Sequence, residues 1–484
     1  MGDMVYDVVV CGGGTSGTAA AVAAARGGAK TLLIERLGAL GGQMNVSGPP
    51  GFAYARLFNG YNEQVIKGFA EEMHARLLRD GHAYKHDLNV YRTHSNYTYS
   101  YVDPDWWGLE IFEVMKENNV DLLLHTLVVG VQKDGDKVNG VIVENANGRL
   151  VIAAKVVIDC TGEGDIAVRA GCDYELRSRE EVEPHTVCFS MDGIDWDEVL
   201  KYVHENPDQI VYSGPNHGSC GDYPDRTLEE HYKIMRNVTN VMDYGDLRGF
   251  YKIRDEAIAN GDWHPYAGVG FFMMPRENGS VIAHMQHSAQ VGNCWSSDAW
   301  DLSKCEAENR HQIIIALKFF RKYMPGFKNA YLCRMGQELR LREGRRIMGD
   351  YKLTGDDIAS GARFYDCIGK YSFPAGAEHV ASTDTISHKK ARNTPNGGTN
   401  DIPYRCLVPV KVEGLLVAGK HVSTDRAAYM RFLQQTVVTG QAAGAAAALA
   451  VKHGVSPREI EEERYIAELQ DILRGQDVVL DGVH

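Results

Sequence analysis

Apolar runs and helical repeats alternate over the first part of the chain. Residues 6–11 form an apolar run that predicts a buried strand, residues 18–26 form an alanine-rich segment that predicts a helix, and residues 30–34 predict a second strand. Residues 64–79 and 106–118 carry apolar side chains at helical spacing and predict two more helices. Strands that alternate with helices are typical of a parallel sheet, so the chain begins as an α/β fold.

A second group of strands follows in the sequence. The pattern predicts strands at residues 122–131, 138–144 and 149–159, and the pair Asn147-Gly148 is a strong signal for a hairpin between the last two. These strands predict a three-stranded β-meander added to the parallel sheet.

The end of the chain returns to the pattern of its beginning. Residues 414–417 predict a buried strand, and residues 432–452 predict a helix made mostly of small residues. Gly440 and Gly444 lie four residues apart in this helix. A helix with so few large side chains must lie close to the element that it packs against.

The first strand leads directly into a turn with glycines at positions 12, 14 and 17. Gly12 permits a tight turn, Gly14 lets the backbone approach a pyrophosphate, and Gly17 lets the next helix lie close to the sheet. Thr15 and Ser16 stand where that helix begins, and a helix N-terminus offers unpaired N–H groups and a partial positive charge to phosphates. This segment predicts a dinucleotide site.

The end of the second strand narrows the choice of dinucleotide. Glu35 stands 18 residues after Gly17, where an acidic side chain accepts hydrogen bonds from ribose hydroxyls. Its charge would repel a 2′-phosphate, which leaves NAD or FAD. The loop with Gly41, Gly42 and Gln43 suggests close backbone approach to a larger cofactor.

A second glycine-containing turn follows the strand at residues 149–159. Thr161, Gly162 and Asp165 suit a backbone that passes beside a cofactor, although an ordinary turn at the end of a strand can have the same residues. Arg342, Arg345 and Arg346 fall at helical spacing. They predict a shared helix face that either binds an anion or is solvated and ion-paired.

The middle of the chain has a different composition. Residues 176–400 hold most of the aromatic residues and histidines, and residues 302–323 predict a long helix there. We therefore expect a discontinuous cofactor-binding domain of residues 1–175 and 401–484, interrupted by an inserted α+β substrate or cap domain of residues 176–400.

Composition excludes several classes of protein. With 51 basic and 64 acidic residues the net charge is −13, which disfavours a nucleic acid or an anionic membrane as partner. The ten cysteines form no CxxC pair, which weighs against iron–sulfur clusters, a zinc ribbon and a dithiol redox pair, and we expect no metal site. No signal peptide or membrane-spanning stretch is visible, so we expect a cytoplasmic protein. The sequence does not distinguish a monomer from a homo-oligomer.

Several motifs together resemble one family. The most specific are residues 159–165 and 342–351, and residues 440–444 are similar to the closing helix of that family. The chain resembles the FAD-dependent oxidoreductases of the fumarate reductase/succinate dehydrogenase flavoprotein type, especially their soluble bacterial members. The resemblance implies a Rossmann-like domain that binds FAD. Some relatives attach FAD to a histidine in the loop after the second strand, but the first histidine here is His74, so we expect non-covalent FAD.

The resemblance also implies which residues contact the cofactor. Pyrophosphate, ribose, adenine and flavin would each meet a separate part of this set. Its members are Gly12, Gly14, Thr15, Ser16, Gly17, Glu35, Arg36, Gly41, Gly42, Gln43, Val129, Thr161, Gly162, Asp165, Gly419, Leu433 and Gln434.

These expectations combine into a reaction. We expect an oxidoreductase that moves a hydride between FAD and a small organic substrate, and such a transfer needs a group that gives or takes a proton. The candidates for this group are His284, His287, His379, His388 and Tyr404. We expect Arg431 and Arg392 to stabilise charge, and Arg431 is the best placed because it stands just before the flavin-facing helix. The alternatives are a flavin monooxygenase or halogenase-like enzyme, and a flavin-carrying electron-transfer subunit.

Overall fold

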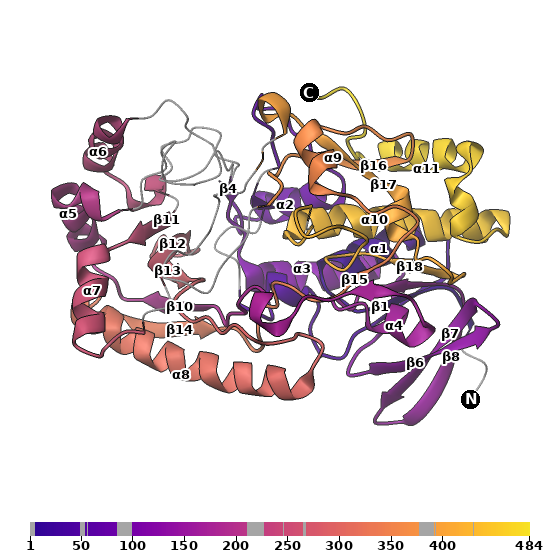
Figure 1. The fold of residues 1–484 in the computed structure, drawn as a ribbon, viewed down its shortest axis with the longest axis horizontal. Helices are drawn as coiled ribbons and strands as arrows, with labels where there is room; N and C mark the ends of the chain where they lie inside the picture. The colour runs from indigo at the N-terminus through magenta and orange to yellow at the C-terminus, as the bar shows by residue number, and fades with distance from the viewer. Residues whose placement is uncertain are drawn as a thin grey trace.

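The computed structural model shows two bodies side by side, which give the molecule an elongated shape (Figure 1). Each body has its own sheet and its own apolar core. The structure describes residues 5–48, 54–55, 57–84, 99–210, 227–244, 246–264, 268–376, 392, 394–428 and 430–484.

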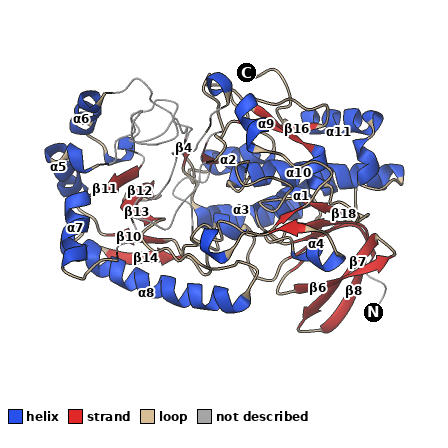
Figure 2. Ribbon diagram, in the orientation of Figure 1, coloured by secondary structure: helices blue, strands red, loops and turns tan. Residues whose placement is uncertain are grey.

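The first body is built on a seven-stranded sheet, drawn on the right of Figure 2. A parallel part and an antiparallel meander share one long strand, β8, which confirms the expected α/β class. The sheet runs in the order β5-β2-β1-β8-β7-β6, with β18 also paired to β8. Its strands are β1 (Val5–Cys11), β2 (Thr31–Ile34), β5 (Asp121–Leu123), β6 (Leu127–Asp134), β7 (Lys137–Asn145), β8 (Gly148–Asp159) and β18 (Leu415–Val417).

One predicted strand divides into two. The apolar run at residues 122–131 predicts a continuous strand, but His125 has a positive φ of 51° and the chain turns there. The part before the turn, β5, pairs with β2 in the parallel sheet, and the part after it, β6, joins the meander. Apolar character alone cannot reveal such a turn, because both halves are strands. Val129 therefore lies near the start of its strand and not near the end.

Two helices of small residues pack directly on one another in the first body. In α10 (Leu433–His453), a Cβ on Gly440 would lie 2.1 Å from the carbonyl oxygen of Ser16 in α1 (Thr15–Arg26). A Cβ on Gly444 would lie equally close to the carbonyl of Ala20. The two backbones therefore touch, as the small residues predicted.

The remaining elements of the first body surround this pair. The described helices include none with both the length and the apolar character needed to cross a lipid bilayer. The helices are α2 (Phe69–Arg79), α3 (Pro104–Glu117), α4 (Asp165–Ala170), α9 (Gly355–Ser360) and α11 (Glu463–Gly475), and the small sheets are formed by β3 (Tyr54–Ala55), β4 (Tyr99–Ser100), β9 (Tyr174–Glu175), β15 (Arg346–Ile347), β16 (Cys367–Tyr371) and β17 (Asn400–Pro403).

The second body is an antiparallel sheet covered by helices. Its core is aromatic, with Phe271 of the sheet packed against Phe320 and Phe327. The strand order is β11-β12-β13-β10-β14. The strands are β10 (Phe189–Asp192), β11 (Asp246–Gly249), β12 (Val269–Pro275), β13 (Val281–Met285) and β14 (Tyr331–Met335), and the helices are α5 (Trp196–Glu205), α6 (Leu228–Asn237), α7 (Tyr251–Ala259) and α8 (Ala299–Tyr323).

Part of the expected insert packs with the first body. Ile347, Leu353, Ile358 and Phe373 belong to the apolar core of the first body, and α9, β16 and β17 lie beside α10 and α11 in Figure 1. The second core ends with Leu339.

The predicted arginine helix is wrong. Arg342 and Arg345 lie in an irregular segment, and Arg346 begins the short strand β15. Gly344 explains the difference, because a Cβ there would lie 1.9 Å from the carboxylate of Glu163. The segment is held by tertiary contacts, and its helical spacing is coincidental. The expected ion pairs exist: Arg345 pairs with Asp165 at 2.8 Å, and Arg346 pairs with Glu343 at 3.1 Å.

The contact between α1 and α10 predicts the effect of added volume. Gly440→Ala should lower the free energy of unfolding by about 1–3 kcal/mol, because its methyl group must push two backbones apart. Urea unfolding measures the change. Gly475→Ala in α11 is the matched control, since nothing lies within 4 Å of its Cβ position, and its stability should be equal or higher. Equal stability of the two variants would contradict the close packing.

Candidate functional site

A cleft lies at the carboxyl ends of strands β1, β2, β8 and β18. This is where open α/β sheets bind their ligands. Residues from both bodies line it: Gly12, Gly14, Thr15, Ser16, Glu35, Arg36, Leu37, Ala39, Gly42, Gln43, Cys160, Thr161, Gly162, Glu163, Glu338, Leu339, Leu341, Gly419, Lys420, Arg431, Leu433 and Thr436.

The glycine turn forms the floor of the cleft. Gly12 has a φ of 102°, and a Cβ there would lie 2.5 Å from the carbonyl oxygen of Cys160. Gly17 lies directly over Gly12, since its Cβ would lie 1.8 Å from the Gly12 carbonyl. Gly14 has no atom within 4 Å of its Cβ position, and no side chain caps the first turn of α1. The free N–H groups of α1 therefore face open space, which fits a bound pyrophosphate.

Glu35 is held in place by the backbone. Its Oε2 accepts a hydrogen bond from the Gly13 N–H at 2.6 Å, and its Oε1 accepts one from the Leu37 N–H at 2.9 Å. The carboxylate keeps further lone pairs for ribose hydroxyls. Beside it, Arg36 forms an ion pair with Glu338 from the other side of the cleft. Burial raises the pKa of Glu338.

Asp159 organises the second glycine turn. Its side chain is fully buried and accepts hydrogen bonds from the Thr161 N–H and hydroxyl, at 3.0 and 2.7 Å. It also accepts the N–H groups of Ile166 and Ala167 at the start of α4, each at 2.9 Å. These bonds fix Thr161 and Gly162 in the cleft wall. Asp165 turns to Arg345 and is not among the lining residues.

Charged side chains gather at the far end of the cleft. The Nη1 of Arg431 lies 2.9 Å from the Oε2 of Glu183, and the two side chains are 10% and 4% exposed. Burial lowers the pKa of Arg340, and burial together with the charge of Arg431 lowers the pKa of Arg342 to about 9. Arg431 and Arg342 thus both interact with Glu183, and Arg340 interacts with Arg431.

A neutral histidine supports this group. The Nδ1 of His185 accepts a hydrogen bond from the Arg342 N–H at 3.2 Å, and its Nε2 lies 3.1 Å from the carbonyl oxygen of Cys294. Burial and nearby Lys420 and Arg342 lower the pKa of His185 to about 3. The imidazole is therefore uncharged at neutral pH and adds no charge to the cluster.

The structure separates the catalytic candidates. Arg431 lines the cleft, and the Nδ1 of His287 lies 3.0 Å from a guanidinium nitrogen of Arg342. Tyr404 is fully buried in the core of the first body, where its hydroxyl donates to the carbonyl oxygen of Pro457 at 2.7 Å, so we remove it from the candidates. Arg392 pairs with Asp356 at the surface. His379 and His388 lie outside the described residues.

His284 is buried in the second sheet. Its Nδ1 lies 3.0 Å from the hydroxyl of Ser190, and burial lowers its pKa to about 3. It does not line the cleft.

Most of the expected cofactor residues come together in the cleft. The described lining contains twelve of them: Gly12, Gly14, Thr15, Ser16, Glu35, Arg36, Gly42, Gln43, Thr161, Gly162, Gly419 and Leu433. Five do not line it: Gly17, Gly41, Val129, Asp165 and Gln434. Gly17 and Gly41 shape the turns, since a Cβ on Gly41 would meet Asn45 and Trp107.

Several lining residues were not predicted. Glu163 and Lys420 form a buried ion pair in the cleft wall, and Thr436 meets Thr15 at 2.7 Å between their hydroxyl oxygens. Glu163 stands inside the predicted turn and Lys420 directly follows Gly419, so both positions carried a signal. Leu339 and Leu341 come from the segment just before the arginines, and no local pattern marks them.

Comparison with known proteins identifies the family but no near relative. Residues 7–473 match the sequence model of the FAD-dependent oxidoreductases. A search of curated proteins found no match. No group of three or more histidine, cysteine or acidic side chains that could hold a metal ion occurs in the described ranges.

Solved structures with a similar chain course are distant. A geranylgeranyl bacteriochlorophyll reductase-like protein from Thermoplasma acidophilum is 15% identical, with 98% of this chain and 88% of that chain covered and a TM-score of 0.46. A p-nitrophenol 4-monooxygenase from Pseudomonas putida is 12% identical, with 98% of this chain and 89% of that chain covered and a TM-score of 0.43. A flavin-dependent brominase variant is 14% identical, with 97% of this chain and 85% of that chain covered and a TM-score of 0.43.

The family match extends over nearly the whole chain and agrees with the glycine turn, the acidic residue after β2 and the cleft that they form. The chain belongs to the family of FAD-dependent oxidoreductases, and it is an enzyme that uses FAD.

Proposed function

We propose that the protein transfers a hydride between non-covalently bound FAD and a small organic substrate that carries negative charge. The presence of Arg431 in the wall of the cofactor cleft, next to the guanidinium group of Arg342, is the observation that carries this proposal. A reductase or dehydrogenase is also what the resemblance to the fumarate reductase/succinate dehydrogenase type implies.

Different residues of the cleft would bind different parts of FAD. The N-terminus of α1 with Gly14 and Ser16 would bind the pyrophosphate, and Glu35 would accept the ribose hydroxyls. Gly42 and Gln43 would lie along the flavin, where the Nε2 of Gln43 is fixed by a hydrogen bond to the Leu341 carbonyl at 3.0 Å. When bound, FAD supplies the group that accepts or donates the hydride.

Arg431 is suited to the substrate side of the reaction. It stands just before α10, so the backbone contact between α10 and α1 fixes its distance from the glycine turn. Its ion pair with Glu183 orients the guanidinium, and the neighbouring Arg342 interacts with the same carboxylate. A planar guanidinium binds a carboxylate in two places or stabilises a developing oxyanion.

The hydride transfer also needs an acid or base that exchanges a proton with the substrate. The candidates for the acid or base are His287, which is linked to Arg342, and His379 and His388, which lie outside the described residues.

We propose that the substrate domain is the second body alone, because residues 347–375 pack into the core of the first body.

The proposed activity can be tested with a panel of compounds before the substrate is identified. Photoreduced enzyme is mixed anaerobically with small carboxylic acids that carry a carbonyl group or an activated double bond, and oxidised enzyme with their reduced counterparts. The flavin absorbance should change with at least one pair. Oxygen-18 from O₂ in the product would favour a monooxygenase instead, and purification with iron–sulfur partners would favour an electron-transfer subunit.

The absence of a histidine from the loop after β2 predicts how FAD is attached. The purified protein should be yellow, and denaturation should release intact FAD into the supernatant. Chromatography of the released flavin is the measurement. Flavin that stays with the precipitated chain would show a covalent link, and FMN would contradict the ribose site.

Glu35→Ala should weaken FAD binding about 10- to 100-fold, the effect of losing a hydrogen bond of about 1.5–3 kcal/mol to a charged group. The loss of the bonds from Gly13 and Leu37 adds to this effect. Titration of apoenzyme with FAD gives the dissociation constant, and saturating FAD should restore most activity. Glu144→Ala, on an exposed strand residue, is the control. An unchanged dissociation constant would exclude Glu35 from the site.

Arg431→Lys should lower the rate of hydride transfer at least ~100-fold, the scale of losing one stabilising donor. FAD content and melting temperature should stay close to those of the wild type. Arg169→Lys, at a half-exposed position on α4, is the matched control and should not change the rate. Early melting or loss of flavin with a normal remaining rate would make Arg431 a structural residue.

A further inference from the structure

A buried lysine–glutamate pair stands in the cofactor cleft. Lys420 follows β18 and Glu163 follows β8, and their side chains form an ion pair with 9% and 8% exposure. Both residues line the cleft. Neither is needed for the glycine turn or for the ribose site, so the pair has no role in the cofactor seat described above.

Contacts along one segment locate the pair in the cleft. Glu338 pairs with Arg36 at the ribose end, the carbonyl of Leu341 accepts from Gln43, and Gly344 lies against the Glu163 carboxylate. Six residue steps reach at most about 20 Å. The segment therefore contacts Arg36, Gln43 and Glu163 in turn. The charges of Lys420 and Arg431 both act on His185, so these two cations lie near one another.

The carboxylate of Glu163 cannot swing away from this position. The hydroxyl of Ser296 donates to its Oε2 at 2.5 Å, and the main chain at Gly344 leaves no room behind it. The backbone carbonyl of Glu163 accepts from Arg345 at 3.2 Å. Glu163 is thus fixed by contacts from the second body and from the segment before β15, and it holds the Lys420 ammonium in turn.

A fixed charge at this place would act on the flavin ring of bound FAD. Reduction of the ring by a hydride adds two electrons and one proton, so the ring gains one negative charge. A nearby ammonium stabilises the charged, reduced form more than the oxidised form, and a low local dielectric strengthens the effect. A carboxylate beside the ammonium cancels most of that effect.

We propose that Lys420 and Glu163 together set the midpoint potential of the bound flavin. Lys420 raises the potential, and Glu163 is the counter-charge that limits the rise. The inference rests on the proposed seat of FAD and makes both residues positioning charges for the proposed hydride transfer. It does not depend on the identity of the substrate.

The test measures the midpoint potential of the FAD-loaded enzyme against a reference dye, together with the dissociation constant of FAD. Glu163→Gln should favour reduced over oxidised flavin at least tenfold, which is an upward shift of about 30 mV for a two-electron couple. Lys420→Met should produce a shift of at least the same size downward. The double variant, which replaces a neutral pair by a neutral pair, should return close to the wild-type potential.

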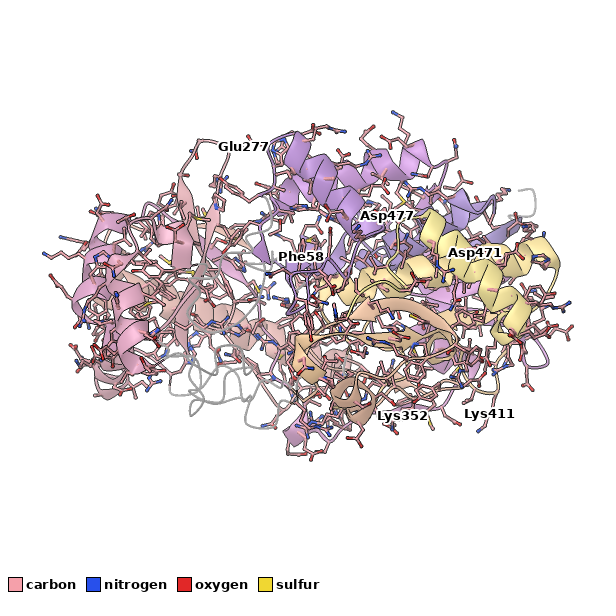
Figure 3. The ribbon with its side chains drawn as sticks, turned by 90° about the horizontal axis from the view of Figure 1, so that it is seen from above. Phe58, Glu277, Lys352, Lys411, Asp471 and Asp477 are labelled. Carbon is pink, nitrogen blue, oxygen red and sulfur yellow. The ribbon has the colours of Figure 1, made fainter. Side chains whose placement is uncertain are left out.

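The controls separate this role from simple binding. Lys420→Arg keeps the charge and should keep the potential. Glu175→Gln removes one partner of the half-exposed pair with Lys352, which Figure 3 shows on the surface, and should not shift the potential because solvent screens it. If Glu163→Gln does not fold, Lys420→Met and the double variant make the same comparison.

Two results would overturn the proposal. In the first, both single variants weaken FAD binding equally in the two redox states and leave the potential unchanged, which would make the pair a cofactor clamp. In the second, both variants shift the potential in the same direction. A failure to find a substrate would count against the proposed function but would leave this measurement valid.

Discussion

The direct contact between the backbones of α1 and α10 is the constraint on which the site depends. Gly440 and Gly444 allow carbonyl groups of α1 to approach where any side chain would intervene. The hydroxyls of Thr15 and Thr436 meet at the same junction. The N-terminal end of α1 and the start of α10 are therefore fixed relative to one another. A glycine turn from the beginning of the chain and an arginine from its end thereby line one cleft.

Local patterns determined much of what could be predicted. The alternation of strands and helices, the glycines at 12, 14 and 17 and the small residues of α10 each reflect a short-range requirement, and the structure confirms the elements that they predicted. The division of one predicted strand into β5 and β6 at His125 could not be predicted, because two consecutive strands in different parts of a sheet have the same apolar pattern as one strand. The arginine spacing misled for a related reason, since tertiary contacts at Gly344 override a chance helical period.

The electrostatics of the site could not be predicted from local patterns. Lys420 and Glu163 are 257 residues apart in sequence, and Arg431 and Glu183 come from different bodies. The types of these residues do not indicate which residue each one pairs with. Only the order of strands in the sheet brings the ends of β8 and β18 together. The same holds for Glu277 of the second body, which lies beside the helices of the first body in Figure 3. Its carboxylate lies 2.8 Å from the Nδ1 of His82.

The position of β18 has a consequence for synthesis of the protein. β8 ends at Asp159, but the strand that covers one side of its carboxyl end begins only at Leu415. A ribosome adding about 5–20 residues per second needs roughly 10 to 50 seconds to make the chain between them. During that interval the nascent chain has a glycine turn but lacks one wall of its nucleotide cleft. The complete cleft therefore forms only after β18 and the first residues of α10, which line it, have been synthesised.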